Sequence, residues 1–215
     1  MGMFSCTAYL SKKFYLKQLH SIKDTIGDTD IYIIDQILKD RYKLSDTILD
    51  AGCGSGRNMY WFLKNNINIY GIDSNEEVIR VLKNTYPLLQ AERLQISLIE
   101  KMPFENDYFD HILSSAVLHF ATTTMHFQNM ITEMVRVLKP RGTLFIRMTS
   151  DIGIEDKVQL KSDGVYAIPD GSTRFLLTRR LLTSLLKKQQ LLFIEPFKTV
   201  NVDDVRCMST LVLQK

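Results

Sequence analysis

The sequence predicts an α/β domain with a doubly wound, mostly parallel central sheet. Short apolar segments alternate with helical patterns through residues 28–150, as in βαβ units that place helices on both faces of a sheet. The last two expected strands, 191–200 and 206–213, flank so short a polar turn that they must pair antiparallel. We expect a single domain over residues 1–215, made of an N-terminal helical cap (1–44), a core (45–149), a long loop (150–177), and a C-terminal helix with a β-hairpin (178–215).

The composition is that of a globular protein. Of the 215 residues, 45% are hydrophobic and 24% are charged, and a net charge of +3 is too small to indicate nucleic acid binding. No apolar run approaches the roughly 20 residues that a membrane helix needs. The three cysteines, Cys6, Cys53 and Cys207, form neither a disulfide framework nor a CxxC metal site, so we expect free thiols in a cytoplasmic protein. Nothing in the sequence indicates an oligomeric state or a targeting signal.

The N-terminal segment divides into two parts. Residues 1–27 are polar and aromatic, as in an irregular or helical arm. The acidic run Asp28–Asp30 then precedes apolar residues at helical spacing, namely Ile31, Ile33, Ile34, Ile37 and Leu38. This pattern predicts a capped amphipathic helix.

A glycine-rich turn follows the first strand of the core, expected over residues 47–51. Its glycines, Gly52, Gly54 and Gly56, fall at alternate positions and precede a helical pattern over 56–65. Glycine permits unusual backbone angles and lets a ligand approach the chain, and the N–H groups of the following helix suit a polar or anionic group. The spacing is G-x-G-x-G, whereas a dinucleotide site requires G-x-G-x-x-G, so it argues against nicotinamide binding.

An acidic residue ends the second expected strand, over residues 68–74. Asp73 lies about 20 residues after the glycine turn, where a carboxylate accepts hydrogen bonds from both ribose hydroxyls. It is equally placed to cap the helix expected over 75–84, and the two roles are compatible. Further strands are expected over 94–100, 111–116 and 143–148, and further helices over 125–138 and 176–190.

Four segments resemble the class I S-adenosylmethionine (SAM)-dependent methyltransferases. Ile48–Gly56 is similar to motif I of that family, and Asp73 matches the acidic residue of motif II. Met102–Asp110 resembles the segment between motifs III and IV, and Val137–Gly142 resembles the phrase before the fifth strand, with Arg141 in place of a glycine. The resemblance covers about residues 45–215. It implies a seven-stranded sheet with a final antiparallel hairpin, SAM as cofactor and S-adenosylhomocysteine (SAH) as product.

The resemblance makes residues 45–149 the cofactor-binding core. The family often has Asp where this chain has Leu98, which leaves the adenine contact to Glu100 or to the backbone of Ile99 or Lys101. Arg57 is placed to neutralise the carboxylate of the cofactor or to cap the loop. The cofactor-binding residues implied are Asp50, Gly52, Cys53, Gly54, Gly56, Arg57, Asn58, Asp73, Ser74, Ile99, Glu100, Lys101 and Ser115.

The acceptor side is less closely defined. His119 is a candidate general base or a wall of the acceptor pocket, and Arg147 ends the fifth strand beside that pocket. The loop over 150–177 is expected to act as a lid that contributes Tyr166 and Arg174, or else to be a plain surface loop. Arg147, Arg174 and Arg206 suit an acidic acceptor. The N-terminal helix either folds over the ligands or simply packs on the sheet.

We therefore expect methyl transfer from SAM to a small-molecule acceptor, driven mainly by positioning. The fourth strand lacks the Pro-Pro-aromatic run of amino-methyltransferases that act on nucleic-acid bases. Two alternatives stay open, a methyltransferase of protein or nucleic acid and a SAM-binding protein without that activity. No spaced cluster of His, Asp and Glu predicts a metal site.

Overall fold

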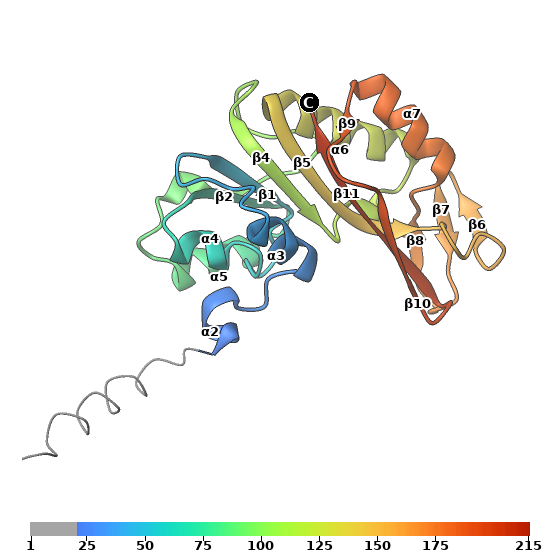
Figure 1. The fold of residues 1–215 in the computed structure, drawn as a ribbon, viewed down its shortest axis with the longest axis horizontal. Coiled ribbons are helices and arrows are strands. Elements are labelled where there is room, and N and C mark those ends of the chain that lie inside the picture. The colour runs from blue at the N-terminus through green and yellow to red at the C-terminus, as the bar shows by residue number, and fades with distance from the viewer. Residues whose placement is uncertain (1–20) are drawn as a thin grey trace, which may run out of the picture.

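The computed structural model describes residues 21–215, which form a central sheet flanked by helices (Figure 1). The strands of this sheet are β1 (Thr47–Ala51), β2 (Asn68–Asp73), β3 (Leu94–Ile96), β4 (Phe109–Ser115), β5 (Leu138–Ser150), β9 (Leu192–Phe193), β10 (Lys198–Val202) and β11 (Arg206–Gln214). Their order is β10-β11-β5-β4-β1-β2-β3, with β9 added beside β11. Strands β1 to β5 run parallel, and β11 is antiparallel to both β5 and β10. The expected fold class is confirmed.

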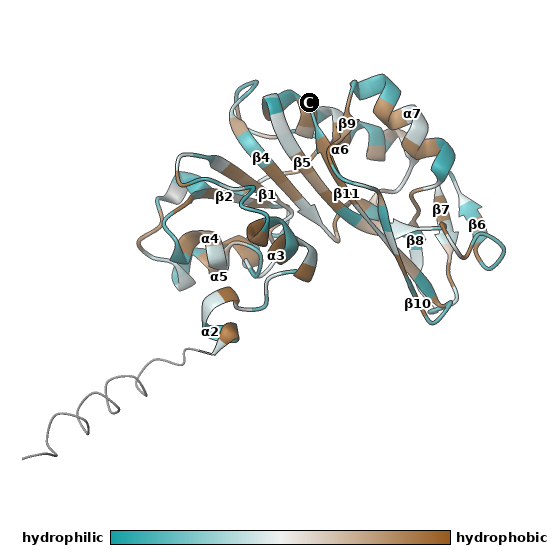
Figure 2. Ribbon diagram, in the orientation of Figure 1, coloured by the Kyte–Doolittle hydropathy of each residue, from teal (hydrophilic) through white to brown (hydrophobic). Residues whose placement is uncertain are grey.

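Helices cover both faces of this sheet. They are α3 (Ile31–Leu38), α4 (Tyr60–Lys64), α5 (Glu76–Thr85), α6 (Thr124–Val137) and α7 (Arg179–Gln189), with short 3₁₀ turns at Ala91–Arg93 and Leu118–Phe120. A further short helix, α2 (Ile22–Ile26), contacts α4 and lies away from the sheet (Figure 1). Adjacent β1 residues point to opposite faces: Ile48 joins the core under α3, α4 and α5, and Leu49 joins the core under α6 and α7. Figure 2 shows β4, β5 and β11 apolar along much of their length, as expected for strands buried on both faces.

The capped helix predicted after Asp28–Asp30 is confirmed as α3. Asp30 is its N-cap, and the side chain accepts a hydrogen bond from the Tyr32 N–H at 3.0 Å. The start of the helix predicted over 56–65 is wrong, because Gly56 has φ +75° and the chain turns before α4 begins at Tyr60. The strand predicted over 94–100 ends at Ile96, where the chain turns back so that Leu98 bridges Lys101.

The segment 150–177, predicted as an irregular loop, contains a second sheet. Its antiparallel strands are β6 (Gln159–Ser162), β7 (Val165–Ala167) and β8 (Thr173–Phe175). Phe175 anchors the sheet by stacking on Phe127 of α6, with ring centroids 4.9 Å apart. Gly164, at φ +74°, lies against Phe175 so closely that a Cβ there would come within 2.2 Å of the ring. Sequence periodicity missed these strands because each has only three or four residues and none alternates buried with exposed side chains.

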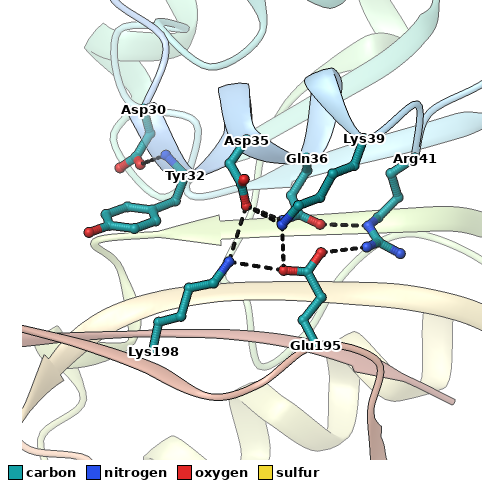
Figure 3. A network of polar contacts seen from close by, with 8 residues as sticks. All are labelled: Asp30, Tyr32, Asp35, Gln36, Lys39, Arg41, Glu195 and Lys198. Atoms are coloured by element: carbon teal, nitrogen blue, oxygen red, sulfur yellow. Dashed lines mark hydrogen bonds and ion pairs between the residues drawn. The ribbon is translucent and has the colours of Figure 1, made fainter.

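An ion-pair network ties α3 to the segment between β9 and β10 (Figure 3). The carboxylate of Glu195 accepts hydrogen bonds from Lys39 at 2.9 Å, Lys198 at 3.0 Å and Arg41 at 2.6 Å. Asp35 accepts from the same two lysines. Burial by itself raises the pKa of Glu195, but the hydrogen bonds outweigh burial and lower the pKa to about 2. The network therefore fixes an early helix against late strands of the chain.

Two further expectations concern the cysteines and the possibility of a membrane-spanning helix. Cys53 and Cys207 are buried free thiols, and Cys6 lies outside the described residues, as do residues 1–20 of the expected N-terminal cap. Within residues 21–215, none of the helices combines the length and the apolar character needed to span a bilayer.

Candidate active site

The glycine turn after β1 forms one wall of a large cavity. Gly52 and Cys53 donate their N–H groups to the Ile72 carbonyl of β2, each at 2.9 Å, which folds the turn back over the sheet edge. Gly52 has φ +85°, and a Cβ there would lie 2.5 Å from Val117 Cγ2. Gly54 has φ +50° and faces open space. Glycine is thus required at the first position by packing, and at the second it leaves the backbone accessible to a ligand.

The carboxylate of Asp73 closes the same wall. One oxygen accepts from Gly54 N at 3.0 Å and the other accepts from Asn75 N at 2.9 Å. The cap of α5 is Asn75, whose side chain accepts from the N–H groups of Glu77 and Val78, so the capping role considered for Asp73 belongs to Asn75. Asp73 is fixed beside the cavity with its remaining acceptor capacity directed at a ligand.

Asp50 lies beneath this turn and is 1% exposed. Neither carboxylate oxygen has a hydrogen-bond partner among residues 21–215. Burial, with a smaller contribution from Asp73, raises the pKa of Asp50 to about 7, and Arg57 opposes the rise. A buried acid without partners is costly and fits a ligand that brings a positive charge or a donor.

The cavity between these walls measures about 600 Å³, within the usual range for a small-molecule site. Its far side comes from the segment after β3 and the end of β4. Ten of the expected cofactor-binding residues line it, namely Gly52, Cys53, Gly54, Arg57, Asn58, Asp73, Ser74, Ile99, Glu100 and Ser115. Of the other three, Asp50 lies beneath the turn, Gly56 packs against Leu82, and Lys101 lines a neighbouring surface hollow.

Asp30 connects the two sides of the site. Its buried carboxylate accepts from Ser115 Oγ at 3.0 Å and from Arg147 Nη1 at 3.1 Å, and lies 3.6 Å from Arg57 Nη2. Its backbone N–H donates to Asn58 Oδ1 at 3.0 Å. The sequence analysis treated Asp30 only as a helix cap, because its partners are far away in the chain.

A second cavity of about 300 Å³ adjoins the first, and Ala116 lines both. Ala116 follows β4 with φ +62°, a conformation that is uncommon outside glycine and is often found at functional sites. The second cavity gathers side chains from four parts of the chain: His119 after β4, Arg147 and Thr149 of β5, Asp170, Ser172 and Arg174 at β8, and Arg206 and Met208 of β11.

His119 is a buried, neutral member of this second cavity. It is 8% exposed, and its Nδ1 atom has no partner among the described residues. Burial, and then the charges of Arg174, Arg206 and Arg147, lower the pKa of His119 to about 4. The imidazole is therefore uncharged at neutral pH and offers the cavity one hydrogen-bond donor and one acceptor.

Residues 49–146 match the family model described as "Methyltransferase domain". Among solved structures, a SAM-dependent methyltransferase from Methanosarcina mazei superposes with a TM-score of 0.67 at 21% identity, covering 83% of this chain and 96% of that one. A Burkholderia thailandensis 1,6-didemethyltoxoflavin-N1-methyltransferase with bound SAH superposes with a TM-score of 0.63 at 17% identity, covering 100% of this chain and 92% of that one. Residues 49–146 thus match a methyltransferase domain, and the chain has the fold of these SAM-dependent methyltransferases.

Curated relatives of this methyltransferase domain include two that act on tRNA. An Arabidopsis thaliana tRNA (carboxymethyluridine(34)-5-O)-methyltransferase is 30% identical over 99 residues, which cover 46% of this chain and 23% of the relative. A Mus musculus tRNA N(3)-cytidine methyltransferase METTL6 is 25% identical over 155 residues, which cover 65% of this chain and 53% of the relative. The chain thus spans between about a quarter and a half of the length of these relatives.

Of the residues that the sequence predicts for the acceptor, the structure brings His119, Arg147, Arg174 and Arg206 into one cavity. Tyr166 lies on β7, paired in register with Arg174, and is not among the residues that line this cavity. His126 lines the large cavity with its Nε2 atom 3.5 Å from Glu100, a position that no sequence motif indicated. Among residues 21–215, no group of three or more His, Cys, Asp or Glu side chains is arranged to hold a metal ion.

Proposed function

We propose that this protein transfers the methyl group of SAM to a small-molecule acceptor held in the second cavity. The observation that supports the proposal is the junction at Ala116, which lines both the larger cavity beside the glycine turn and the smaller cavity lined by three arginines. SAM supplies an activated methyl group on a sulfonium, so the chain has chiefly to align the acceptor with that methyl. Alignment of two bound reactants can provide much of the rate enhancement.

The residues present fit SAM on the cofactor side. Asp73 is available to the ribose hydroxyls, and the buried Asp50, which has no hydrogen-bond partner among residues 21–215, suits the ammonium of the methionine moiety. Arg57 is placed for the methionine carboxylate, and Glu100 with the backbone of Ile99 is placed for adenine. Gly54 leaves its backbone open to the ligand.

On the acceptor side, the neutral His119 is proposed to accept a proton or a hydrogen bond from the acceptor. Arg147 and Arg174 hold the acceptor in place. The sheet of β6, β7 and β8 is proposed as the lid, since its Arg174 and the Asp170–Ser172 turn form one side of the cavity. A volume of about 300 Å³ suits a small molecule or a small group on a larger one.

The second candidate is methyl transfer to tRNA. It is favoured by the named relatives, of which one acts on carboxymethyluridine and the other on cytidine of tRNA. In this case the modified base, rather than a free metabolite, enters the second cavity.

Calorimetric titration with SAM, SAH and NAD tests the cofactor assignment. We expect SAM and SAH to bind, NAD not to bind, and Asp73→Ala to weaken SAH binding by about tenfold or more, since hydrogen bonds to a charged group are each worth roughly 1.5–3 kcal/mol. Asp156→Ala, at an exposed site beyond β5, is the matched control. Binding of NAD without SAM or SAH contradicts the proposal.

Transfer of label from methyl-labelled SAM separates the two acceptor classes. The purified protein is incubated with a small-molecule extract and, separately, with unfractionated tRNA. Label that enters small molecules and disappears with Asp73→Ala supports the proposal. Label that enters only tRNA replaces it with the second candidate, and SAH binding without any transfer leaves a SAM-binding protein.

A further inference from the structure

We infer that the second cavity recognises its acceptor through an anionic group, a carboxylate or a phosphate, held by Arg174 and Arg206 beside His119. The inference rests on the proposed function, because it names the acceptor class for the same site. It follows from the charges that line the cavity and from two buried polar atoms that have no hydrogen-bond partner among residues 21–215.

The cavity has more positive charge than its own carboxylates neutralise. Arg147 is paired with Asp30 behind the cavity at 3.1 Å, and Arg206 lies 3.6 Å from Asp170. The polar contact of Arg174 is its hydrogen bond to the Thr173 carbonyl at 2.8 Å. Its guanidinium also lies over the Phe120 ring, 5.3 Å from the centroid. Within residues 21–215, Arg174 has no acidic partner, so one guanidinium is available for a ligand.

Two buried polar atoms at the cavity lack a hydrogen-bond partner among the described residues. His119 Nδ1 and Arg147 Nε are both shielded from solvent, and neither has a hydrogen-bond partner among the described residues. Both residues line the second cavity. Buried polar groups in native proteins are nearly always paired, so two orphans on one cavity indicate a ligand that completes them.

An anion satisfies these features together. The planar guanidinium donates paired hydrogen bonds that match the oxygens of a carboxylate or a phosphate. An oxygen of the same group can accept from the imidazole N–H of His119, whose neutral ring does not repel the arginines. A neutral acceptor leaves the charge of Arg174 uncompensated, which is unfavourable in a partly buried site.

Substitution of Asp170 should raise the affinity for an anion, whereas loss of an arginine should lower it. Its carboxylate lines the cavity and competes with a bound anion for Arg206. Asp170→Asn removes that competing charge and keeps an oxygen for the Ser172 N–H, with which Asp170 now makes a 2.9 Å hydrogen bond. The variant should therefore bind anions more tightly than the wild type, whereas loss of either arginine should weaken binding.

The test is calorimetric titration of the SAH-saturated protein with inorganic phosphate and with succinate, at constant ionic strength. Succinamide, which has a similar shape and no charge, is the matched probe. We expect phosphate or succinate to bind, Arg174→Gln and Arg206→Gln each to weaken that binding by about tenfold or more, and Asp170→Asn to strengthen it severalfold. Arg180→Gln, on the exposed face of α7, is the control and should change nothing.

Three results overturn the inference: neither anion binds, Arg174→Gln and Arg206→Gln leave anion binding unchanged, or succinamide binds as tightly as succinate. SAH affinity, measured for every variant, reports whether the fold and the cofactor cavity are intact. If SAH fails to bind the wild type, the proposed function fails. The anion titrations are then repeated without SAH, and their dependence on the arginines decides the inference separately.

Discussion

The two cavities are built in different ways. One wall of the larger one comes from a single stretch of the chain, from β1 through the glycine turn to Asp73, and the key groups of this wall are backbone amides and two carboxylates. The smaller one collects side chains from the end of β4, from β5, from β8 and from β11. A short local motif is enough to build the wall of the larger cavity, whereas the residues proposed to recognise the acceptor are brought together only by the fold.

The largest effect expected comes from adding one methyl group at the glycine turn of the larger cavity, compared with a glycine that lines neither cavity. Gly52→Ala introduces a Cβ at φ +85° that meets Val117 at 2.5 Å. We expect it to lower the free energy of unfolding by about 2–5 kcal/mol, from backbone strain and overpacking, and to abolish SAH binding. Gly153→Ala has φ +94° but open space around it, so it should cost only about 1 kcal/mol and leave SAH binding intact. Urea unfolding and calorimetry measure both, and equal effects contradict the distinction.

Asp50→Asn tests whether the buried carboxylate beneath the glycine turn lowers the stability of the protein while it strengthens cofactor binding. The pKa of Asp50 is raised from 3.8 to about 7, so the native state prefers the protonated form and loses stability as the pH rises from about 4 to 7. At pH 8 the Asn variant should be more stable than the wild type by about 1–3 kcal/mol, and near pH 4 the difference should vanish. Its SAH affinity should fall by about tenfold or more.

The check is thermal unfolding of both proteins from pH 4 to pH 8, with Asp156→Asn as the control for an exposed acid. A stability difference that does not change with pH shows that the charge of Asp50 is not responsible.

Glu195→Gln tests the link between an N-terminal helix and the C-terminal strands. The pKa of Glu195 is lowered from 4.5 to about 2, so its contribution is complete above about pH 4.5 and is lost as the pH falls towards 2. The variant should lose about 1–2 kcal/mol at pH 7 and progressively less below pH 4.5. Urea unfolding at several pH values measures this, with the exposed helix pair variant Glu77→Gln expected to change stability less. Equal losses at pH 7 and pH 2.5 refute the ion-pair explanation.

Tyr166→Phe should have the smallest effect. Tyr166 was predicted to contact the acceptor, yet it lies on β7 outside the residues that line the second cavity. We expect its loss of a hydroxyl to leave the affinity for phosphate or succinate within about twofold, because no ligand contact is removed. A tenfold loss of this affinity, measured by calorimetry, contradicts the expectation and indicates that Tyr166 contacts the bound anion.

The features that sequence reasoning predicted well are those with local causes. The apolar run of β1, the cap at Asp30 and the alternate glycines each depend on residues a few positions apart. The second sheet in residues 150–177 was missed because its strands are short and lack a hydrophobic period. The role of Asp30 was missed for another reason: Arg147 lies more than a hundred residues further along the chain, and only the fold brings the pair together.

The position of Asp30 has a thermodynamic consequence for the two ligands. Its single carboxylate lies between Arg57 on the cofactor side and Arg147 on the acceptor side. A cofactor carboxylate that draws Arg57 away leaves the charge of Asp30 to Arg147 alone, which reduces the attraction of Arg147 for an acceptor anion. Linkage then requires the anion to weaken cofactor binding by the same factor. We therefore expect the two ligands to bind with negative cooperativity, which favours departure of each product while the other is still bound.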